Sequence, residues 1–233
     1  MDLIEEFSLP SEGKIYSKQI PVTYSIRAPR LSDRAIGNTS SKNKIQSEVL
    51  LRCLEPKPEI VPYDWHTSDY TMANLAQRKA ARGSKMPLRV ICRNCQTAQD
   101  IEVDLDEVKI TKPKLPFDLE YTTAAGEKVS LRFFTPRILD QIKYNIKKYK
   151  EDYPNADQDI GLQETVRAIV VSVDGETLPY SKMTNWLMNC YEIDLNGMVD
   201  KVVATNFGPV LIKRDVCPNC GNIITYSISP DEG

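Results

Sequence analysis

Two short stretches decide the fold: CRNC at residues 92–95 and CPNCG at residues 217–221. Each holds two cysteines separated by two residues, a spacing that lets one tight turn direct both sulfur atoms at a metal ion about 2.3 Å away. Neither turn alone supplies the four ligands that zinc prefers, so each turn predicts the other as its partner. The sequence therefore predicts one zinc ion, with about half of the chain between its two ligand pairs, held by Cys92, Cys95, Cys217 and Cys220.

Three other interpretations of the cysteine pairs stay open: two independent pairs, a redox-active pair, or buried thiols. A redox pair of the thioredoxin type begins a helix after a strand, whereas both pairs here lie between strand-like segments. A catalytic zinc keeps an open position and usually binds His or a carboxylate. Four thiolates close the shell, so the predicted zinc is structural. Cys53 and Cys190 fall on apolar helical stripes and are predicted to be core thiols.

Apolar periodicity predicts an α+β fold built on a zinc-ribbon-like pair of β-hairpins that carries the four-cysteine site. In chain order, the predicted units are an extended N-terminal arm at 1–21, a strand and helices at 22–84, a first zinc-knuckle hairpin at 85–112, a second hairpin at 113–134, a helical insertion at 135–208 and a second zinc-knuckle hairpin at 209–233. The insertion begins with Thr135 as a helix cap and Pro136 at the first helical position. Further helices are expected at about 161–171, 181–190 and 194–204. An insertion of this length is tolerated because closure entropy costs only about 0.6 kcal/mol per doubling of loop length.

The composition argues against several classes of protein. The net charge is −2, which gives no global attraction for nucleic acid. No stretch approaches the roughly 18 apolar residues of a membrane helix, and the acidic start MDLIEEFSLP does not resemble a secretory signal. We therefore expect a cytoplasmic protein with reduced thiols. The only histidine, His66, is expected at the surface or as a helix cap, and no catalytic motif is present, so no enzymatic activity is expected.

Six short motifs follow one another along nearly the whole chain: LPSEGKIY at 9–16, EVLLRCLEP at 48–56, RVICRNCQTAQDIEVDLDEVKI at 89–110, GEKVSLRFFTPRILDQI at 126–142, IVVSVDGE at 169–176 and VCPNCG at 216–221. Their order resembles the baseplate assembly chaperone family of contractile-tailed phages, the T-even-type hub chaperones and their relatives. The first knuckle departs from that pattern because it lacks proline and glycine. The lysine-rich helix and the linker YKEDYPNADQD at 149–159 look particular to this chain and leave the identity of the partners open.

The resemblance implies a non-enzymatic protein of phage tail assembly, either a baseplate hub chaperone or a hub component. It implies binding to hub or tape-measure proteins, to other assembly chaperones or to further copies of the chain. The expected location is the cytoplasm of the bacterial host during assembly, with retention in the baseplate of the virion as an open alternative. No membrane contact is expected.

The N-terminal arm is the first candidate for the partner-binding surface because it carries many apolar groups on a segment with little capacity to fold alone. These residues are Leu3, Ile4, Phe7, Leu9, Ile15 and Tyr16. The alternative is that the arm packs on its own domain. The lysine face of the helix at 137–150 is the second candidate, with a solvated surface as its alternative.

A nucleic-acid-binding zinc ribbon is the alternative function. Four basic residues next to the knuckles motivate it: Arg89, Arg93, Lys213 and Arg214. The acidic segment DIEVDLDE at 100–107, directly after the first knuckle, argues against it because it would repel phosphates.

Overall fold

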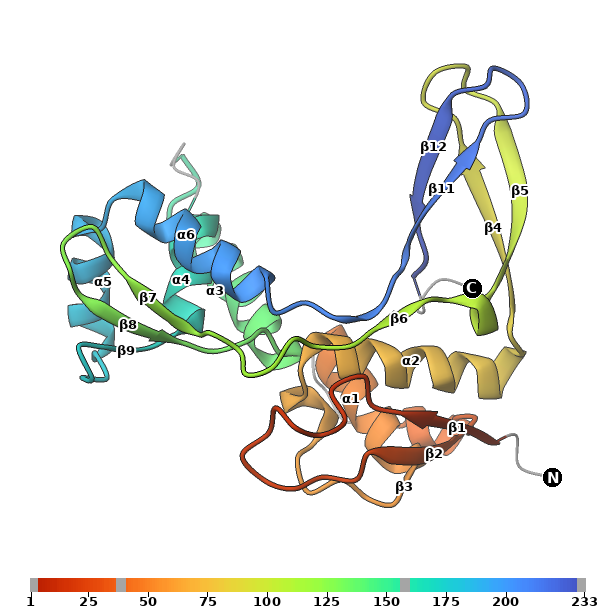
Figure 1. Ribbon diagram of the computed structural model, residues 1–233, viewed down its shortest axis with the longest axis horizontal. Helices are drawn as coiled ribbons and strands as arrows, with labels where there is room; N and C mark the ends of the chain where they lie inside the picture. The colour runs from red at the N-terminus through yellow and green to blue at the C-terminus, as the bar shows by residue number, and fades with distance from the viewer. Residues whose placement is uncertain (1–3, 37–40, 156–159, 230–233) are drawn as a thin grey trace.

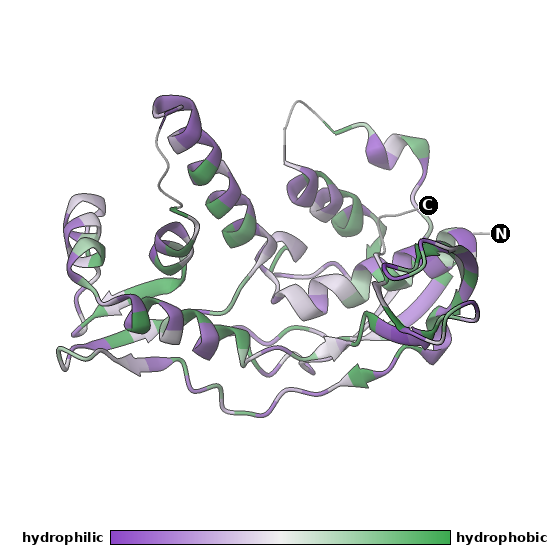
Figure 2. Ribbon diagram, turned by 90° about the horizontal axis from the view of Figure 1, so that it is seen from above, coloured by the Kyte–Doolittle hydropathy of each residue, from purple (hydrophilic) through white to green (hydrophobic). Residues whose placement is uncertain are grey.

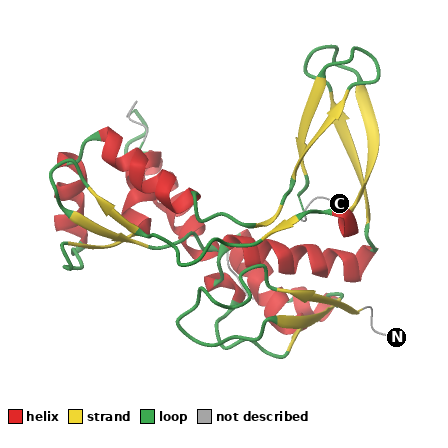
Figure 3. Ribbon diagram, in the orientation of Figure 1, coloured by secondary structure: helices red, strands yellow, loops and turns green. Residues whose placement is uncertain are grey.

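The computed structural model describes residues 4–36, 41–155 and 160–229. It combines six α-helices with several small antiparallel sheets within these ranges. Figure 1 shows three parts: an N-terminal lobe at the bottom, two long hairpins that rise side by side at the upper right, and a helical lobe on the left. Figure 3 shows that the hairpins contain strands alone, whereas both lobes mix helices with short strands.

The N-terminal lobe packs helices on a small sheet. Its strands lie in one antiparallel sheet, in the order β1 (Ile4–Ser8), β2 (Thr23–Arg27) and β3 (Leu54–Glu55). Its helices are α1 (Lys42–Cys53) and α2 (Thr67–Arg82), with the short 3-10 turns η1 (Leu31–Arg34) and η2 (Pro62–Asp64). Val49, Leu50 and Cys53 form the apolar stripe of α1 and are buried, which confirms Cys53 as a core thiol.

The predicted extended arm packs on its own lobe. Phe7 and Leu9 are buried in the same core as Tyr24 and Trp65, and β1 pairs along its whole length with β2. These two residues therefore follow the alternative interpretation, in which the arm packs on its own domain. Ile4 is 60% exposed and Ile15 is half-buried, whereas Leu3 lies outside the described residues.

The segment after β1 is fixed by a buried carboxylate on α2. Asp69 accepts hydrogen bonds from the Ser11 backbone N–H (3.0 Å), the Ser11 hydroxyl (2.5 Å) and the Tyr16 hydroxyl (2.7 Å). Burial raises the pKa of Asp69 from its ordinary value, and the hydrogen bonds from Ser11 and Tyr16 oppose that rise. Tyr16 is thus engaged inside the lobe, and partner binding by Ile4, Ile15 or Tyr16 stays a prediction.

The helical lobe places helices against a three-stranded sheet. The strand order is β7 (Glu120–Thr122), β8 (Lys128–Leu131) and β9 (Val170–Val173), and the helices are α3 (Pro136–Asp152), α4 (Gly161–Ile169), α5 (Tyr180–Asn189) and α6 (Glu192–Val203). Thr135 caps α3 by accepting from the Ile138 N–H, and Pro136 is its first residue, as predicted. Hydrophobic and hydrophilic residues alternate along the helices in Figure 2. None of the described helices has both the length and the hydrophobicity needed to cross a bilayer.

Strand β9 links the β7–β8 hairpin to the helices that follow it, which the sequence predicted as separate units. It pairs with β8, so that Val129 lies opposite Val173 and Ser130 opposite Ser172. Val129 and Leu131 of the hairpin share one core with the helices that follow. The predicted helix at 161–171 ends earlier, at Ile169, because the β-branched residues that follow favour a strand.

The two long hairpins are formed by β4 (Lys85–Ile91) with β5 (Ala98–Asp104), and by β11 (Ile212–Val216) with β12 (Ile223–Ser227). We call them the hairpin pair. They are separate two-stranded sheets that contact each other through side chains. At their base, a core cluster continues into α2; it comprises Leu75, Met86, Val103, Leu105, Val108 and Ile228. The short turn η3 (Leu105–Glu107) follows β5, and β6 (Ile110–Thr111) then pairs with β10 (Gly208–Pro209) where the chain leaves for and returns from the helical lobe.

Helix α3 fixes the helical lobe on the N-terminal lobe. Asp140 accepts hydrogen bonds from Asn43 Nδ2 (2.7 Å), from the Tyr63 hydroxyl (2.9 Å) and from the Ser41 hydroxyl. One turn earlier, the guanidinium of Arg137 holds the carboxylate of Asp64 with two hydrogen bonds of 2.5 and 2.9 Å. A bidentate pair of this kind fixes orientation as well as distance.

His66 lies at the junction of the lobes among three aromatic rings. Its ring centroid is 4.5 Å from that of Phe207, 5.1 Å from Phe133 and 6.2 Å from Phe117. His66 Nδ1 accepts from the Ser68 N–H and so caps α2. The capping role is confirmed, but the side chain is 1% exposed and a surface position is therefore wrong. Burial lowers the pKa of His66 from 6.5 to about 4.

The depressed pKa of His66 predicts a loss of stability in mild acid. Between about pH 6.5 and pH 4 the unfolded chain binds a proton that the folded chain does not, so the free energy of unfolding falls as the pH falls. The contribution of His66 between pH 7 and pH 5 is about 2 kcal/mol. Urea unfolding at both pH values should show this loss in the parent chain. His66→Asn keeps a capping side chain but cannot titrate, so its loss should be smaller by that amount; equal losses would contradict the assignment.

Candidate metal centre

The turns of the two hairpins have the same backbone hydrogen bonds. In the first, the Cys92 N–H donates to Thr97 O (3.0 Å) and the Gln96 N–H to Cys92 O (2.8 Å). In the second, the Cys217 N–H donates to Asn222 O (2.8 Å) and the Gly221 N–H to Cys217 O (2.9 Å). Each turn is therefore closed by its own backbone, and both cysteine side chains of each turn can face the opposite hairpin.

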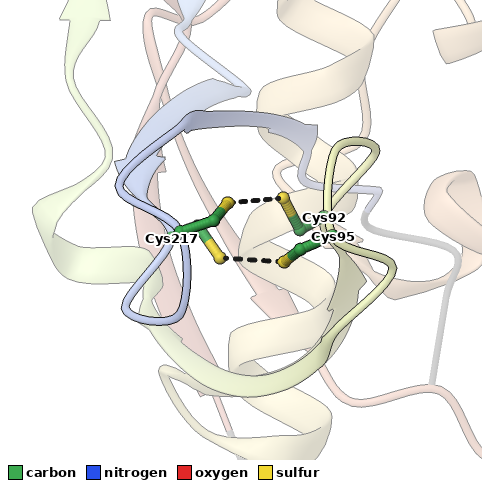
Figure 4. A group of neighbouring side chains, drawn as sticks. Cys92, Cys95 and Cys217 are labelled. Atoms are coloured by element: carbon green, nitrogen blue, oxygen red, sulfur yellow. Dashed lines mark hydrogen bonds between the residues drawn. The ribbon is translucent and has the colours of Figure 1, made fainter.

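The four predicted ligands meet at the tip of the hairpin pair. Cys92 Sγ lies 3.7 Å from Cys220 Sγ, and Cys95 Sγ lies 3.7 Å from Cys217 Sγ. All four sulfur atoms lie within 4.8 Å of one another, and Figure 4 shows Cys92 and Cys95 of one turn facing Cys217 of the other. Cys92 and Cys217 are each 1% exposed, so the cluster is closed on its inner side.

This geometry fits a metal ion. Four sulfur atoms at about 2.3 Å from a tetrahedral centre are separated from each other by about 3.8 Å, and the two measured contacts of 3.7 Å match that edge. Ile224 packs beside the sulfur atoms in the same small cluster. Among the described residues, these four cysteines form the one group of metal-ligating side chains that converges in this way. The cluster can therefore hold a metal ion, and four thiolates would leave no open position on it.

Polar neighbours stabilise the thiolate form of two cysteines. Hydrogen bonding to Thr97, and then to Asn219, lowers the pKa of Cys95 from 9.0 to about 5. The backbone N–H of Asn222 lowers the pKa of Cys220, whereas burial raises that of Cys217. The thiolate is the form that binds metal, so hydrogen bonds of this kind favour binding.

Three neighbours of the sulfur atoms were not found from the sequence: Thr97, Gln99 and Asn219. Gln99 Nε2 donates to Cys217 Sγ across the two hairpins (3.2 Å), and Asn219 Nδ2 donates to Thr97 Oγ1 (3.1 Å). These bonds tie each turn to the opposite one. The strand register could have indicated Gln99, because it lies opposite Val90, two residues before Cys92.

The first turn compensates for its missing glycine. Gln96 occupies the position that Gly221 has in the second turn, and both have a left-handed φ, 57° and 73° respectively. Only glycine adopts this region without a steric penalty. The Gln96 side chain donates to Arg93 O (2.9 Å), which holds the turn in place locally.

A family model described as "T4 bacteriophage base plate protein" matches residues 5–229 of the chain. The match includes both cysteine turns and every described helix and strand beyond the first residue of β1. Neither the curated proteins nor the solved structures contain a match to the chain.

Cys217→Ser should release the metal and destabilise the chain, because three thiolates cannot close the shell. By analogy with a disulfide, opening a cross-link across so long a loop costs up to about 5 kcal/mol, which corresponds to a melting temperature lower by roughly 10 to 20 °C in a chain of this size. Metal content by plasma mass spectrometry and melting by circular dichroism test this. Cys190→Ser is the matched control, since Cys190 packs against the helical core and should leave the metal content unchanged; equal metal loss in both variants would refute the ligand assignment.

Gly221→Ala should cost about 1 kcal/mol without loss of metal. A Cβ at Gly221 meets no atom within 4 Å, so the penalty is that of the left-handed backbone alone. Chemical unfolding of the metal-loaded protein measures it. Gln96→Gly relieves the same strain on the other turn, so it should not destabilise by a similar amount; a loss of metal in Gly221→Ala would show that the turn has a further role.

Proposed function

The chain belongs to the T4 bacteriophage base plate protein family, and on this premise we propose that it is a non-enzymatic assembly protein of the phage base plate. It acts as a chaperone or component of the central hub and binds hub or tape-measure proteins. The observation that carries the proposal is the length of the family match, which runs from residue 5 to residue 229. The order of motifs shared with the hub chaperones supports the more specific role.

The proposed metal is a single structural zinc ion. Cys92, Cys95, Cys217 and Cys220 would hold it, and when bound it supplies a cross-link between the two turns of a zinc-ribbon-like pair. The all-sulfur donor set supports zinc over magnesium or calcium, which prefer oxygen ligands. The chain's own contribution is to orient the thiolates, through Gln99 from one hairpin and through the backbone of both turns.

The environments of the side chains that could carry chemistry support a non-enzymatic role. His66 is enclosed by aromatic rings and caps a helix, so it is not presented to a substrate. Asp69 is fully engaged by Ser11 and Tyr16. The thiolates would coordinate the metal ion and would then not be available as nucleophiles.

A nucleic-acid-binding role is less well supported. Arg89 lies opposite Asp100 in the strand pair, and Asp215 beside Arg214 accepts a hydrogen bond from the Tyr226 hydroxyl. Carboxylates are thus interspersed with the basic residues near the knuckles, which weakens attraction for phosphates.

The proposal predicts that hub or tape-measure proteins co-purify with the chain from infected cells. A tagged chain expressed during infection, purified from nuclease-treated lysate, should enrich these proteins over a tag-only control in mass spectrometry. Metal analysis of the same sample should give one zinc per chain.

Two controls make this test decisive. Detection of the chain in purified mature particles would identify a retained component, whereas its absence there would identify a chaperone that leaves. Recovery of neither hub nor tape-measure proteins would refute the proposed function. A gel shift with DNA or RNA at low salt would instead support the nucleic-acid role.

A further inference from the structure

A basic pocket opens on the N-terminal lobe between η1, α1 and α2. It has a volume of about 400 Å³. Four of its lining residues are cations that come from three elements of the fold: Arg34, Lys42, Arg78 and Arg82. None of the described residues that line it carries a carboxylate. Within the described parts of the chain, none of these four cations forms an ion pair with an acidic side chain.

One amide side chain of the pocket, that of Gln77, has a donor without a partner. Gln46 Nε2 donates to both Asn74 Oδ1 and Gln77 Oε1, at 2.7 Å each, and so engages both carbonyl oxygens. The Gln77 side-chain nitrogen is buried and has no hydrogen-bond partner. Gln77 itself is 5% exposed.

Arg78, like Gln77, has a buried side-chain nitrogen without a hydrogen-bond partner, and Arg78 is also charged. It is 8% exposed, and its Nε has no hydrogen-bond partner. Its hydrogen bond from Nη1 to Gly83 O is long, at 3.4 Å. Burial and the nearby charge of Arg82 lower the pKa of Arg78. A guanidinium that is mostly buried and has no acidic partner among the described residues costs stability, and an anion bound beside it would offset part of that cost.

We propose that this pocket binds the carboxylates of an acidic segment of a partner protein. The four cations, the two unpartnered donors beside them and the lack of an acid among the described lining residues favour a ligand that is anionic and accepts hydrogen bonds. Carboxylates fit because arginine holds them through two parallel hydrogen bonds.

The size of the pocket favours a segment over a single small anion. A volume of about 400 Å³ corresponds to roughly a dozen water molecules at about 30 Å³ each, so one inorganic anion would leave most of it filled with water. Several cations spread over η1, α1 and α2 suit several carboxylates along one chain. That the segment belongs to a protein rests on the proposed function, in which this chain binds other base plate proteins.

The experiment measures binding of a fluorescein-labelled hexaglutamate peptide to the full chain by anisotropy, with a hexaglutamine peptide as control. Lys42→Glu/Arg82→Glu changes two exposed cations of the pocket and should weaken binding of the acidic peptide at least tenfold. Lys143→Glu/Lys148→Glu makes the same charge change on the lysine face of α3 and should weaken it less than twofold. Equal losses in the two double variants, or no binding of hexaglutamate by the parent chain, would overturn the proposal.

Arg78→Met tests the buried donor separately. The ligand-free variant should melt at the same temperature as the parent or higher, because it loses an unsatisfied buried group, yet it should bind hexaglutamate at least fivefold more weakly. Unchanged binding would overturn the role of Arg78.

Two further probes separate the sources of negative charge. Inorganic phosphate, or a hexathymidylate, that binds this pocket at least as tightly as hexaglutamate would overturn an acidic protein segment as its ligand. This outcome is independent of co-purification from infected cells. Recovery of hub proteins without peptide binding would refute the pocket alone, and peptide binding without hub proteins would refute the base plate function alone.

Discussion

The convergence of four sulfur atoms from two turns is the constraint on which the hairpin pair depends. An isolated two-stranded hairpin is marginally stable in water, and among the described strands each hairpin forms a separate two-stranded sheet. Side chains join the hairpins at their base, around Met86 and Ile228, and at their tip, around the cysteines. Because about half of the chain separates the two turns, the tip contact also fixes where two distant parts of the sequence must meet.

The other two parts of the molecule hold together by different means. Each lobe has a hydrophobic core of its own, so neither relies on the cysteines for its packing. Their mutual position depends on polar contacts of α3, in which Asp140 and Arg137 engage the N-terminal lobe. His66 adds an aromatic contact at the same junction, with Phe207 and Phe133. The two hairpins thus meet at the cysteine cluster, whereas the two lobes meet through polar contacts of α3 and aromatic contacts of His66.

The sequence predicted best where chemistry leaves few options. Cysteine spacing identified the four clustered thiols, and a Thr-Pro pair marked the start of α3. It was less informative where partners are distant in the chain. It could not decide whether the arm packs on its own domain, because the partner strand β2 and the buried Asp69 cannot be identified locally. The first two residues of β9 were predicted as the end of a helix, because the pairing of β9 with β8 depends on the tertiary fold. The basic pocket was missed for the same reason, since no short stretch contains its four cations.

The pairing of β6 with β10 has a consequence for how such a molecule can change. Residues Ile110–Thr111 and Gly208–Pro209 bring the outgoing and returning chain side by side, as seen in Figure 1. Residues 112–207 therefore begin and end at neighbouring points in space. A segment whose ends lie close together tolerates exchange and insertion. Evolution can change residues 112–207 to suit a new binding partner while the hairpin pair and its four cysteines keep their structure.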